Sequence, residues 1–288
     1  MILSVFILLV FTRTAFQKKG TITLSFTGGS YIAVGSYIYG PDGKWASSYR
    51  GGKPYFKRKT TLTYYGPIRW IKHQPYYSIG HWGYIRAQEV VVLDHKNTFV
   101  LRRNSYVYNQ AGKRLKYFRN SQRPVVLDHR IPVHFVGKGE STQANKKYFY
   151  ILDEFNKPRG DTSDKHWLPY RKINGCYYYY LGYGGYIKAY NVLFINGWFN
   201  YSNGAKVKIA KWGDVKFAVA VNQHEQDQKS PKFRRGSTVT VDASKWLSTY
   251  SNGSQYYRIK GTKDTFIGRD DLASNPEKKR ALTQLPSN

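Results

Sequence analysis

Few residues of this chain are arranged as the reactive groups of an enzyme would be. The string VVLDH occurs twice, at residues 91–95 and 125–129, and each copy ends in an Asp-His dipeptide. Adjacent residues of a strand point to opposite faces, so Asp94 could not orient His95 as a catalytic dyad within one strand. We therefore predict a turn or capping role for both dipeptides.

Cysteine chemistry is limited to one residue. Cys176 is the single cysteine of the chain, which excludes an intramolecular disulfide and a multi-cysteine zinc or iron-sulfur site. A Cys-His nucleophile pair is disfavoured because Cys176 directly follows the turn signal Asn174-Gly175. The sequence contains no P-loop, HExxH or GxSxG motif. It thus predicts a protein that is not an enzyme, with no catalytic residue, no metal site and no cofactor.

Positive charge is the dominant chemical property of the chain. Its 46 Lys and Arg residues stand against 17 Asp and Glu, which gives a formal net charge of +29. A charge of this size favours contact with a polyanion such as nucleic acid, an anionic membrane surface or a phosphate-rich wall polymer. Folded domains are expected rather than disorder, because 41% of the residues are hydrophobic.

The elements that would carry this charge are predicted to be strands. Residues 21–27 alternate, so that Ile22, Leu24 and Phe26 share one face, and residues 206–209 and 238–241 alternate in the same way. Glycine-containing turn signals separate such runs, and Asn-Gly between strand residues is the strongest short-range hairpin signal. The sequence predicts a mainly β protein with little helix.

Internal repeats organise the chain. SYIYGPDGK (36–44) matches SYVYNQAGK (105–113), and PYYSIGHWGYIRAQEV (75–90) aligns without gaps to YYYYLGYGGYIKAYNV (177–192). A third, weaker copy aligns PKFRRGSTVTV (231–241) to PYFKRKTTLTY (54–64). We call residues 36–90, 105–192 and 216–272 the first, second and third repeat. The second carries an insertion near 137–172.

Repetition favours a multivalent binding surface over a single active site, because tethered sites raise each other's effective concentration. Cations recur in the turns and strands of the repeats, and a solvent-exposed strand face explains them almost as well as binding. The candidate polyanion-binding residues are Lys44, Lys57, Arg58, Arg86, Lys113, Arg114, Lys116, Lys188, Arg234 and Arg235.

Pairs of tyrosines recur in the strands of each repeat. Neighbours on a strand face opposite sides, so we expect one ring of each pair in the core and the other outside. An outward ring could stack on a sugar or donate its hydroxyl to a phosphate. The sequence does not decide which member faces out. The candidate stacking residues are Tyr76, Tyr77, Tyr178, Tyr179, Tyr256 and Tyr257.

Residues 75–90 and 177–192, which we call the closing motif of the repeats, resemble the SLAP domain, the tandem wall-anchoring repeat of lactobacillar S-layer and surface proteins. NSYVYNQAGKR (104–114) followed by INGCYYYYLGYGGYIKAYNV (173–192) carries the resemblance best. The first repeat departs at Glu89, where Asn is usual, and the third keeps only Tyr256, Tyr257, Ile259 and Phe266-Ile267. With this resemblance we expect tandem small β-hairpin or SH3-like barrel units.

The resemblance implies a secreted protein that attaches non-covalently to the Gram-positive cell wall through teichoic or lipoteichoic acid. The implied location is extracellular, in the cell wall or S-layer. A basic, Tyr-rich β protein that binds nucleic acid is the alternative, and non-specific nucleic-acid binding in vitro fits either interpretation. A peptidoglycan-binding accessory of a wall enzyme and a lattice subunit are less favoured.

The expected domain boundaries follow from the repeats. Residues 1–19 are expected to form a signal-like apolar leader, degraded or truncated because no cation precedes the apolar run Ile2–Phe11, and a chance apolar start is the alternative. That run is too short to span a membrane. Three β units are expected at 20–92, 93–192 and 193–272, and residues 273–288 form a C-terminal tail.

Overall fold

A computed structural model describes residues 19–24, 35–119, 125–152, 165–247, 254–276 and 282–285. The chain divides into two compact units, residues 1–89 and 90–288, and each is described by itself. The mainly β prediction is confirmed, since helical structure in the described residues is limited to one-turn 3-10 segments. The apolar run of the expected leader lies outside the described residues. None of the described helical segments is long and apolar enough to cross a membrane.

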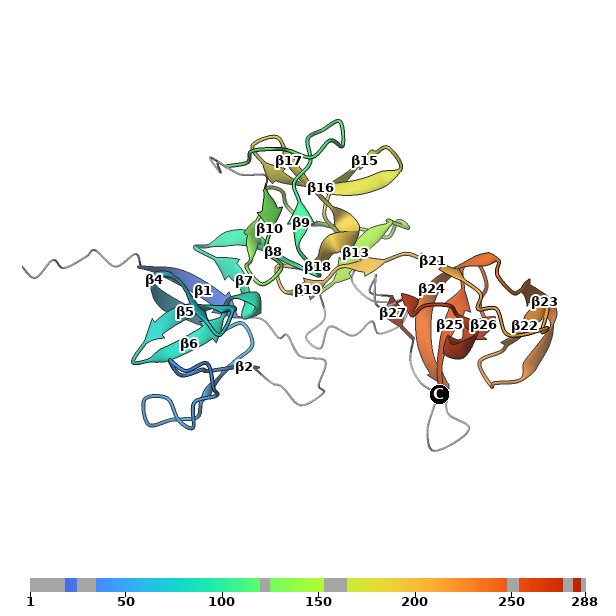
Figure 1. Ribbon diagram of the computed structural model, residues 1–288, viewed down its shortest axis with the longest axis horizontal. Helices are drawn as coiled ribbons and strands as arrows, with labels where there is room; N and C mark the ends of the chain where they lie inside the picture. Colours follow the sequence, from blue (N-terminus) through green and yellow to red (C-terminus); the bar gives the residue numbers. More distant parts are fainter. Residues whose placement is uncertain are drawn as a thin grey trace, which may run out of the picture. The chain divides into compact units, whose positions relative to one another are not determined.

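The first unit contains an antiparallel sheet in the order β1-β4-β5-β6 (Figure 1). The alternation in residues 21–24 has the expected effect, because Ile22 and Leu24 are fully buried. A short pair, β2 and β3, and the 3-10 turn η1 complete the unit. The elements are β1 (Lys19–Leu24), β2 (Gly35–Tyr37), β3 (Tyr55–Lys57), β4 (Thr61–Ile71), β5 (Gln74–Gly80), β6 (Gly83–Arg86) and η1 (Ala87–Glu89).

The second unit begins with strands in the order β19-β18-β8-β7, with β11 also paired to β8. Its next sheet, β15-β16-β17, is followed by the turn η3. The elements are β7 (Val90–Leu93), β8 (Lys96–Leu101), β11 (Val133–His134), β15 (Tyr170–Ile173), β16 (Cys176–Gly182), β17 (Gly185–Lys188), η3 (Ala189–Asn191), β18 (Val192–Ile195) and β19 (Trp198–Phe199).

The described part of the expected insertion forms a sheet with β20, in the order β12-β14-β13-β20, and a two-stranded pair, β9 and β10, lies nearby in the sequence. Tyr148 and Tyr150 of β13 join the core of the second repeat together with Leu168. The strands are β9 (Ser105–Tyr106), β10 (Val126–Leu127), β12 (Glu140–Ser141), β13 (Tyr148–Ile151), β14 (Lys165–Trp167) and β20 (Tyr201–Ser202).

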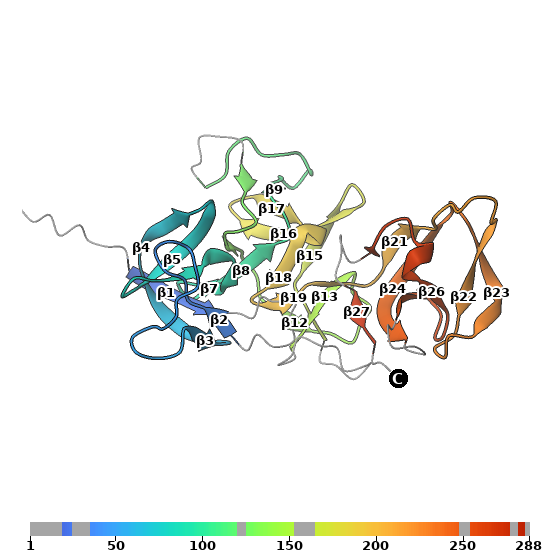
Figure 2. The same ribbon diagram turned by 60° about the horizontal axis from the view of Figure 1, so that its bottom comes forward.

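The third repeat, together with the flanking strands β21 and β27, forms a sheet in the order β21-β24-β25-β26-β22-β23, with β27 parallel to β24. Figure 2 shows β24, β26, β22 and β23 of this sheet from a second direction. The order β21-β24-β25-β26 repeats that of β1-β4-β5-β6. The elements are β21 (Ala205–Lys208), β22 (Phe217–Val221), β23 (Asp227–Arg234), β24 (Thr238–Leu247), β25 (Ser254–Ile259), β26 (Phe266–Gly268), η4 (Arg269–Asp271) and β27 (Thr283–Gln284).

One expectation about architecture is wrong. The repeats do not close into SH3-like barrels, because every described sheet has two ends and stays open. In the first unit the short pair β2 and β3 stays separate from the four-stranded sheet, and the isolated bridge between Tyr39 and Tyr84 is the backbone pairing that joins the 35–52 segment to β6.

The first and second repeats fold the closing motif identically. In both, the strand after the turn, β6 or β17, begins with a glycine, Gly83 or Gly185. A ring from the loop that follows β2 or β9 packs over this glycine. A Cβ atom at Gly83 would lie 2.5 Å from the Tyr49 ring, and one at Gly185 would lie 2.2 Å from the Phe118 ring. Glycine is therefore required at both positions by close approach rather than by backbone conformation.

The same loops also satisfy an equivalent main-chain carbonyl. In the first repeat the Tyr49 hydroxyl donates a hydrogen bond to the Ile79 carbonyl at 3.1 Å. In the second repeat the Arg119 guanidinium donates to the Leu181 carbonyl at 2.6 Å. We call this contact the loop latch. Each loop is thus held to its hairpin by a ring contact and by hydrogen bonding to this carbonyl.

The core of the second repeat contains a buried polar network. Tyr179 is fully buried, and its hydroxyl donates to Asn200 Oδ1 at 2.9 Å. Asn200 Nδ2 in turn donates to the carbonyls of Ala189 and Val192, at 2.9 and 3.1 Å. The network therefore ties β16 to both ends of η3.

Candidate anion-binding surface

A row of three side chains crosses the closing sheet of the first repeat. Arg69 on β4 pairs with Tyr76 on β5, and Tyr76 pairs with Arg86 on β6. Directly paired residues of neighbouring strands lie on the same face. The second repeat has the same row, in which Arg171, Tyr178 and Lys188 are paired across β15, β16 and β17. We call these two sets the cation rows.

Each cation row places two positive charges two strands apart, which corresponds to about 10 Å between their backbones. Arg69 and Arg171 are exposed, whereas Arg86 and Lys188 are half-buried. The sequence interpretation missed Arg69 and Arg171, because they precede the aligned closing motif. The signal was present, since each lies seven residues before the tyrosine of its row.

Aromatic rings hold the cations of both rows. The Arg86 guanidinium lies 4.4 Å from the centre of the Tyr39 ring, and Lys188 Nζ lies 5.1 Å from that of Tyr108. Arg69 donates a hydrogen bond to the Tyr84 hydroxyl at 2.7 Å, and Arg171 lies 5.9 Å from the equivalent ring of Tyr186. The rings fix where the charges sit without neutralising them.

The half-buried cations keep their charge. Burial lowers the pKa of Arg86, but the hydrogen bond with Tyr76 and the nearby Tyr39 outweigh it and raise the pKa overall. Burial likewise lowers the pKa of Lys188, and Tyr190, Tyr108 and Tyr178 raise it overall. Both side chains are therefore positive at neutral pH.

The third repeat departs from this arrangement. Its row is Lys245, Tyr256 and Gly268, so glycine replaces the cation of β26, and Lys245 is buried. Burial raises the pKa of Tyr256, and the carboxylates of Glu225, Asp271, Asp227 and Asp270 raise it further. An anion would meet these acidic side chains, so the row occurs as a cationic surface in two repeats and not in three.

The predicted turn cations are exposed in both repeats that carry the turn. Gly43 and Gly112 have φ of 75° and 76°, as the turns require, and they pack onto Ile71 and Ile173. Lys44, Lys113, Arg114 and Lys116 are exposed. Arg114 lies over the Tyr106 ring, with its guanidinium 3.8 Å from the ring centre. These residues remain candidates for anion contact.

The predicted strand cations differ from one another. Lys57 and Arg234 occupy equivalent register positions, paired with Gly35 and Phe217, and both are exposed. Arg58 is partly buried and has an interaction partner. Arg235 is largely buried, and its guanidinium forms an ion pair with Asp271 at 2.8 Å. Arg235 therefore serves the fold of the third repeat rather than a free anion-binding position.

The tyrosine expectation needs correction, because both rings are buried in the pairs Tyr76-Tyr77 and Tyr178-Tyr179. A second layer of aromatic residues covers the face that would otherwise be outside. Tyr39 packs edge-on against Tyr76 at 5.3 Å, and Tyr108 packs against Tyr178 at the same distance. In the third pair Tyr257 is fully buried and Tyr256 is partly buried.

Other aromatic residues are exposed in their place. Trp45, 66% exposed, stacks on Tyr37 with ring centres 4.9 Å apart and an interplanar angle of 12°. Arg114 occupies the equivalent position over Tyr106 in the second repeat. A sugar ring would thus meet Trp45 and Tyr37 rather than the tyrosines of the closing motif.

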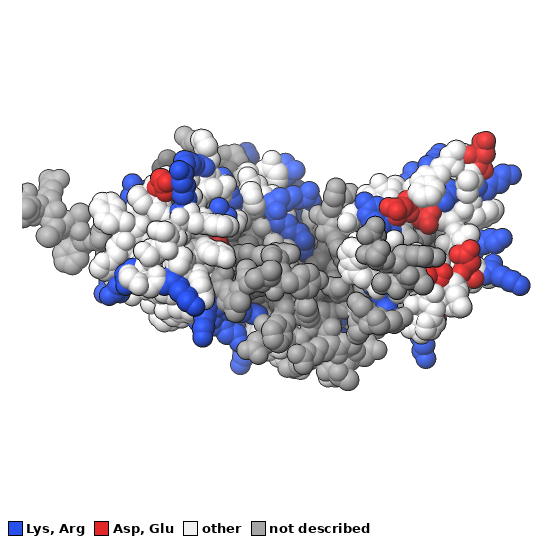
Figure 3. All heavy atoms as spheres, turned by 90° about the horizontal axis from the view of Figure 1, so that it is seen from below, with Lys and Arg blue, Asp and Glu red and all other residues white. Residues whose placement is uncertain are grey.

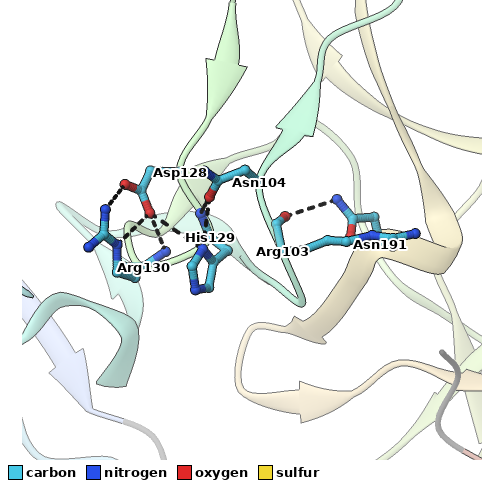
Figure 4. Close-up of polar contacts among 6 residues, drawn as sticks. All are labelled: Arg103, Asn104, Asp128, His129, Arg130 and Asn191. Carbon is cyan, nitrogen blue, oxygen red and sulfur yellow. Dashed lines mark hydrogen bonds and ion pairs between the residues drawn. The ribbon is translucent and has the colours of Figure 1, made fainter. Parts of the chain in front are cut away.

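The Asp-His dipeptides lie in turns, as predicted. Asp94 and His95 both have positive φ in the β7–β8 turn. Figure 4 shows the second dipeptide, in which Asp128 binds Arg130 and the His129 ring binds Asn104. The ion pair with Arg130 holds the pKa of Asp128 below its usual range. His129 Nδ1 lies 3.6 Å from Asp128 Oδ1 but makes its shorter contact, at 2.8 Å, with Asn104 Oδ1. These contacts shape the turn.

The same view shows what Asn191 does in η3. Its Nδ2 donates a hydrogen bond to the Arg103 carbonyl at 3.0 Å (Figure 4).

Among the described residues there is no group of three or more His, Cys, Asp or Glu side chains that could hold a metal ion. Cys176 is a free, partly buried thiol next to Tyr178.

The distribution of surface charge agrees with a cationic surface on the first and second repeats. On the face drawn in Figure 3, acidic side chains gather mainly over the third repeat, and most charged side chains on the rest of the described surface are Lys and Arg. The two repeats with cation rows are therefore also those with few acidic side chains on this face.

Comparison with protein-family models finds two matches. The surface layer protein A domain matches residues 26–88 and 90–154 in tandem. The first match includes Arg69, Tyr76 and Arg86, whereas Arg171, Tyr178 and Lys188 lie beyond the second. No curated protein matches the chain.

Proposed function

Because residues 26–88 and 90–154 belong to the surface layer protein A domain family, we propose that this surface protein attaches to the Gram-positive cell wall by binding teichoic acid. The family match indicates a cell-surface, non-enzymatic role. The polymer, the contact residues and the mode of attachment are the proposal.

The observation that carries the proposal is the pair of cation rows. Each offers two fixed charges on one sheet face, and fixed charges lose little side-chain entropy when they contact phosphate. A polymer of repeating phosphates offers contacts to the row of each unit, and weak contacts along one chain add up to lasting attachment.

Binding should depend steeply on salt. By analogy with single-stranded nucleic acid, each neutralised phosphate contributes about −0.7 to the slope of log affinity against log salt. Four row cations predict a slope of about −2.8, or a loss of affinity of about 20-fold between 0.1 and 0.3 M NaCl. The measurement is binding of the full-length chain to isolated walls over a salt series.

The same isolated walls also test which wall polymer the protein binds. Chemical removal of teichoic acid should reduce binding by at least about tenfold at 0.1 M salt, since most phosphate contacts are lost. Full binding to stripped walls would contradict the proposal and indicate peptidoglycan as the ligand.

The row itself is tested by two neighbouring substitutions. Arg171→Ala should make the salt slope less negative by about 0.7 and weaken wall binding about fivefold at 0.1 M salt. Lys172→Ala is the matched control, because Lys172 is exposed on the same strand but pairs with Tyr177 on the opposite face. Equal losses in the two variants would show that diffuse charge, not the row, binds the polymer.

A further inference from the structure

A hollow at the N-terminal border of the third repeat lies outside the cation rows and outside the residues that match the family. It has a volume of about 430 Å³ and lies between loop 211–217 and the end of β23. Its lining includes Lys211, Trp212, Lys216, Phe217 and Arg234. A volume of this size is at the lower end of small-molecule sites and suits one compact ligand.

The Trp212 ring is held in place from one side. The Arg235 guanidinium lies 4.4 Å from the ring centre. Arg235 is in turn fixed by Asp271 at 2.8 Å and by the Ala210 carbonyl at 3.2 Å, and its side chain is 8% exposed. Trp212 nevertheless remains 47% exposed. The hollow therefore contains a positioned ring with a large free surface.

Charge around this ring is positive. Lys211, Lys216 and Arg234 are exposed lining residues, and Asp214 is the one acidic residue of the lining. Arg235 is already paired with Asp271. Three cations against one carboxylate favour an anionic ligand, and the carboxylate can accept hydrogen bonds from hydroxyl groups.

We propose that this hollow binds a phosphate-bearing sugar residue. The apolar face of the sugar packs on Trp212, with Phe217 beside it, and the phosphate contacts Lys211, Lys216 and Arg234. Asp214 accepts hydrogen bonds from sugar hydroxyls. This proposal rests on the proposed function for where such ligands occur, namely in glycosylated phosphate polymers of the wall, and it adds a site that recognises the sugar as well as the charge.

The third repeat gives an independent reason for a separate site. Its row has lost the β26 cation and has gained acidic neighbours. Three exposed cations, Lys211, Lys216 and Arg234, instead surround the hollow at the end of β23. The third repeat would thus contact one sugar phosphate residue of a polymer in the hollow, whereas the first and second repeats would contact its phosphates along their rows.

Titration with α-D-glucose 1-phosphate tests the site in the full-length chain. The readout is the indole N–H signal of Trp212 in NMR spectra, which Trp212→Phe removes and so assigns. A ligand of this size at ordinary efficiency should bind with a dissociation constant of about 0.3–1 mM. Glucose and inorganic phosphate should each bind at least tenfold more weakly. The indole of Trp246, exposed on β24, should not shift.

Substitutions separate contact from general charge. Arg234→Ala should weaken binding of the sugar phosphate about fivefold or more, whereas Lys206→Ala removes an exposed charge outside the lining and should leave it unchanged. Trp212→Phe should bind more weakly than the unaltered chain, as measured from the backbone amide signals of residues 211–217, while remaining folded, because a smaller ring still packs on Arg235.

Each contrary result has a definite meaning. An equal response to inorganic phosphate, or no response of Trp212, would overturn the proposal. Tighter binding of AMP than of glucose 1-phosphate would also overturn it, in favour of a nucleotide site. The wall-binding experiment is read separately: stripped walls that still bind refute teichoic acid as the polymer, whereas a negative titration refutes only the hollow.

Discussion

Replacing Tyr179 with alanine should lower the free energy of unfolding of the second repeat by about 3–5 kcal/mol, the range for truncating a large buried aromatic side chain. The ring packs against Phe99 and Tyr170, with centres 5.4 and 6.2 Å away. Its loss also removes the hydroxyl that binds Asn200. Hydrogen exchange of β16 and β17 amides in the full-length chain measures the effect as lost protection.

Two controls divide this loss into its parts. Tyr179→Phe keeps the ring and removes only the buried hydrogen bond, so it should cost about 1–2 kcal/mol. Tyr180→Ala truncates the exposed neighbour and should cost less than about 1 kcal/mol. If Tyr180→Ala cost as much as Tyr179→Ala, the burial of Tyr179 would not explain the result.

Substituting Glu89 with glutamine should stabilise the first unit at pH 8 by about 3 kcal/mol. Burial raises the pKa of Glu89 from 4.5 to about 7, against the opposing effects of Ser36 and Arg86. The folded state therefore binds the proton more tightly than the unfolded state, so the stability due to Glu89 is full below pH 4.5 and declines as the pH rises to 7. Each pKa unit corresponds to about 1.4 kcal/mol, which gives the expected gain.

The pH profile distinguishes this cause from others. In the unaltered chain, protection of β5 and β6 amides should decrease between pH 4.5 and 7, and in Glu89→Gln this decrease should disappear. Asp42→Asn changes an exposed carboxylate of the same unit and should keep it. A loss of stability at pH 8 in Glu89→Gln would instead mean that the charge pair of Glu89 with Arg86 is net stabilising.

Turns and strand faces were predictable because they depend on local chemistry. The turn signal Asn174-Gly175 has φ of 47° and 76°, as a two-residue hairpin turn requires. Val207 and Ile209 are buried while Lys206 and Lys208 are exposed, as their alternation indicates. No contact distant in sequence is needed for either result.

The burial of both tyrosines in a pair was not predictable, because it depends on a second layer. Strand alternation places Tyr76 and Tyr77 on opposite faces, and both faces are covered: Tyr39 packs on the first ring and Tyr64 on the second. Tyr39 is distant in sequence, and its return to β6 is a tertiary contact. The domain boundaries inferred from the repeats remain predictions.

Two of the four row cations, Arg69 and Arg171, were missed for a different reason. The pairing of Arg69 with Tyr76 and of Arg171 with Tyr178 is set by hairpin register, which the closing motif alone does not contain. An alignment extended toward the N-terminus would have superposed the two arginines. Their position beside a buried tyrosine still required the structure.

The loop latch bears on how such a protein can change over generations. The acceptor is a main-chain carbonyl, which is present whatever side chain its residue carries, whereas the donor is a Tyr hydroxyl in one copy and an Arg guanidinium in the other. Duplicated copies can therefore replace the donor by successive substitutions while the sheet stays the same. Drift of this kind removes sequence identity faster than it alters shape, and the third repeat, with few matching residues but a recurring strand order, is an advanced stage of it.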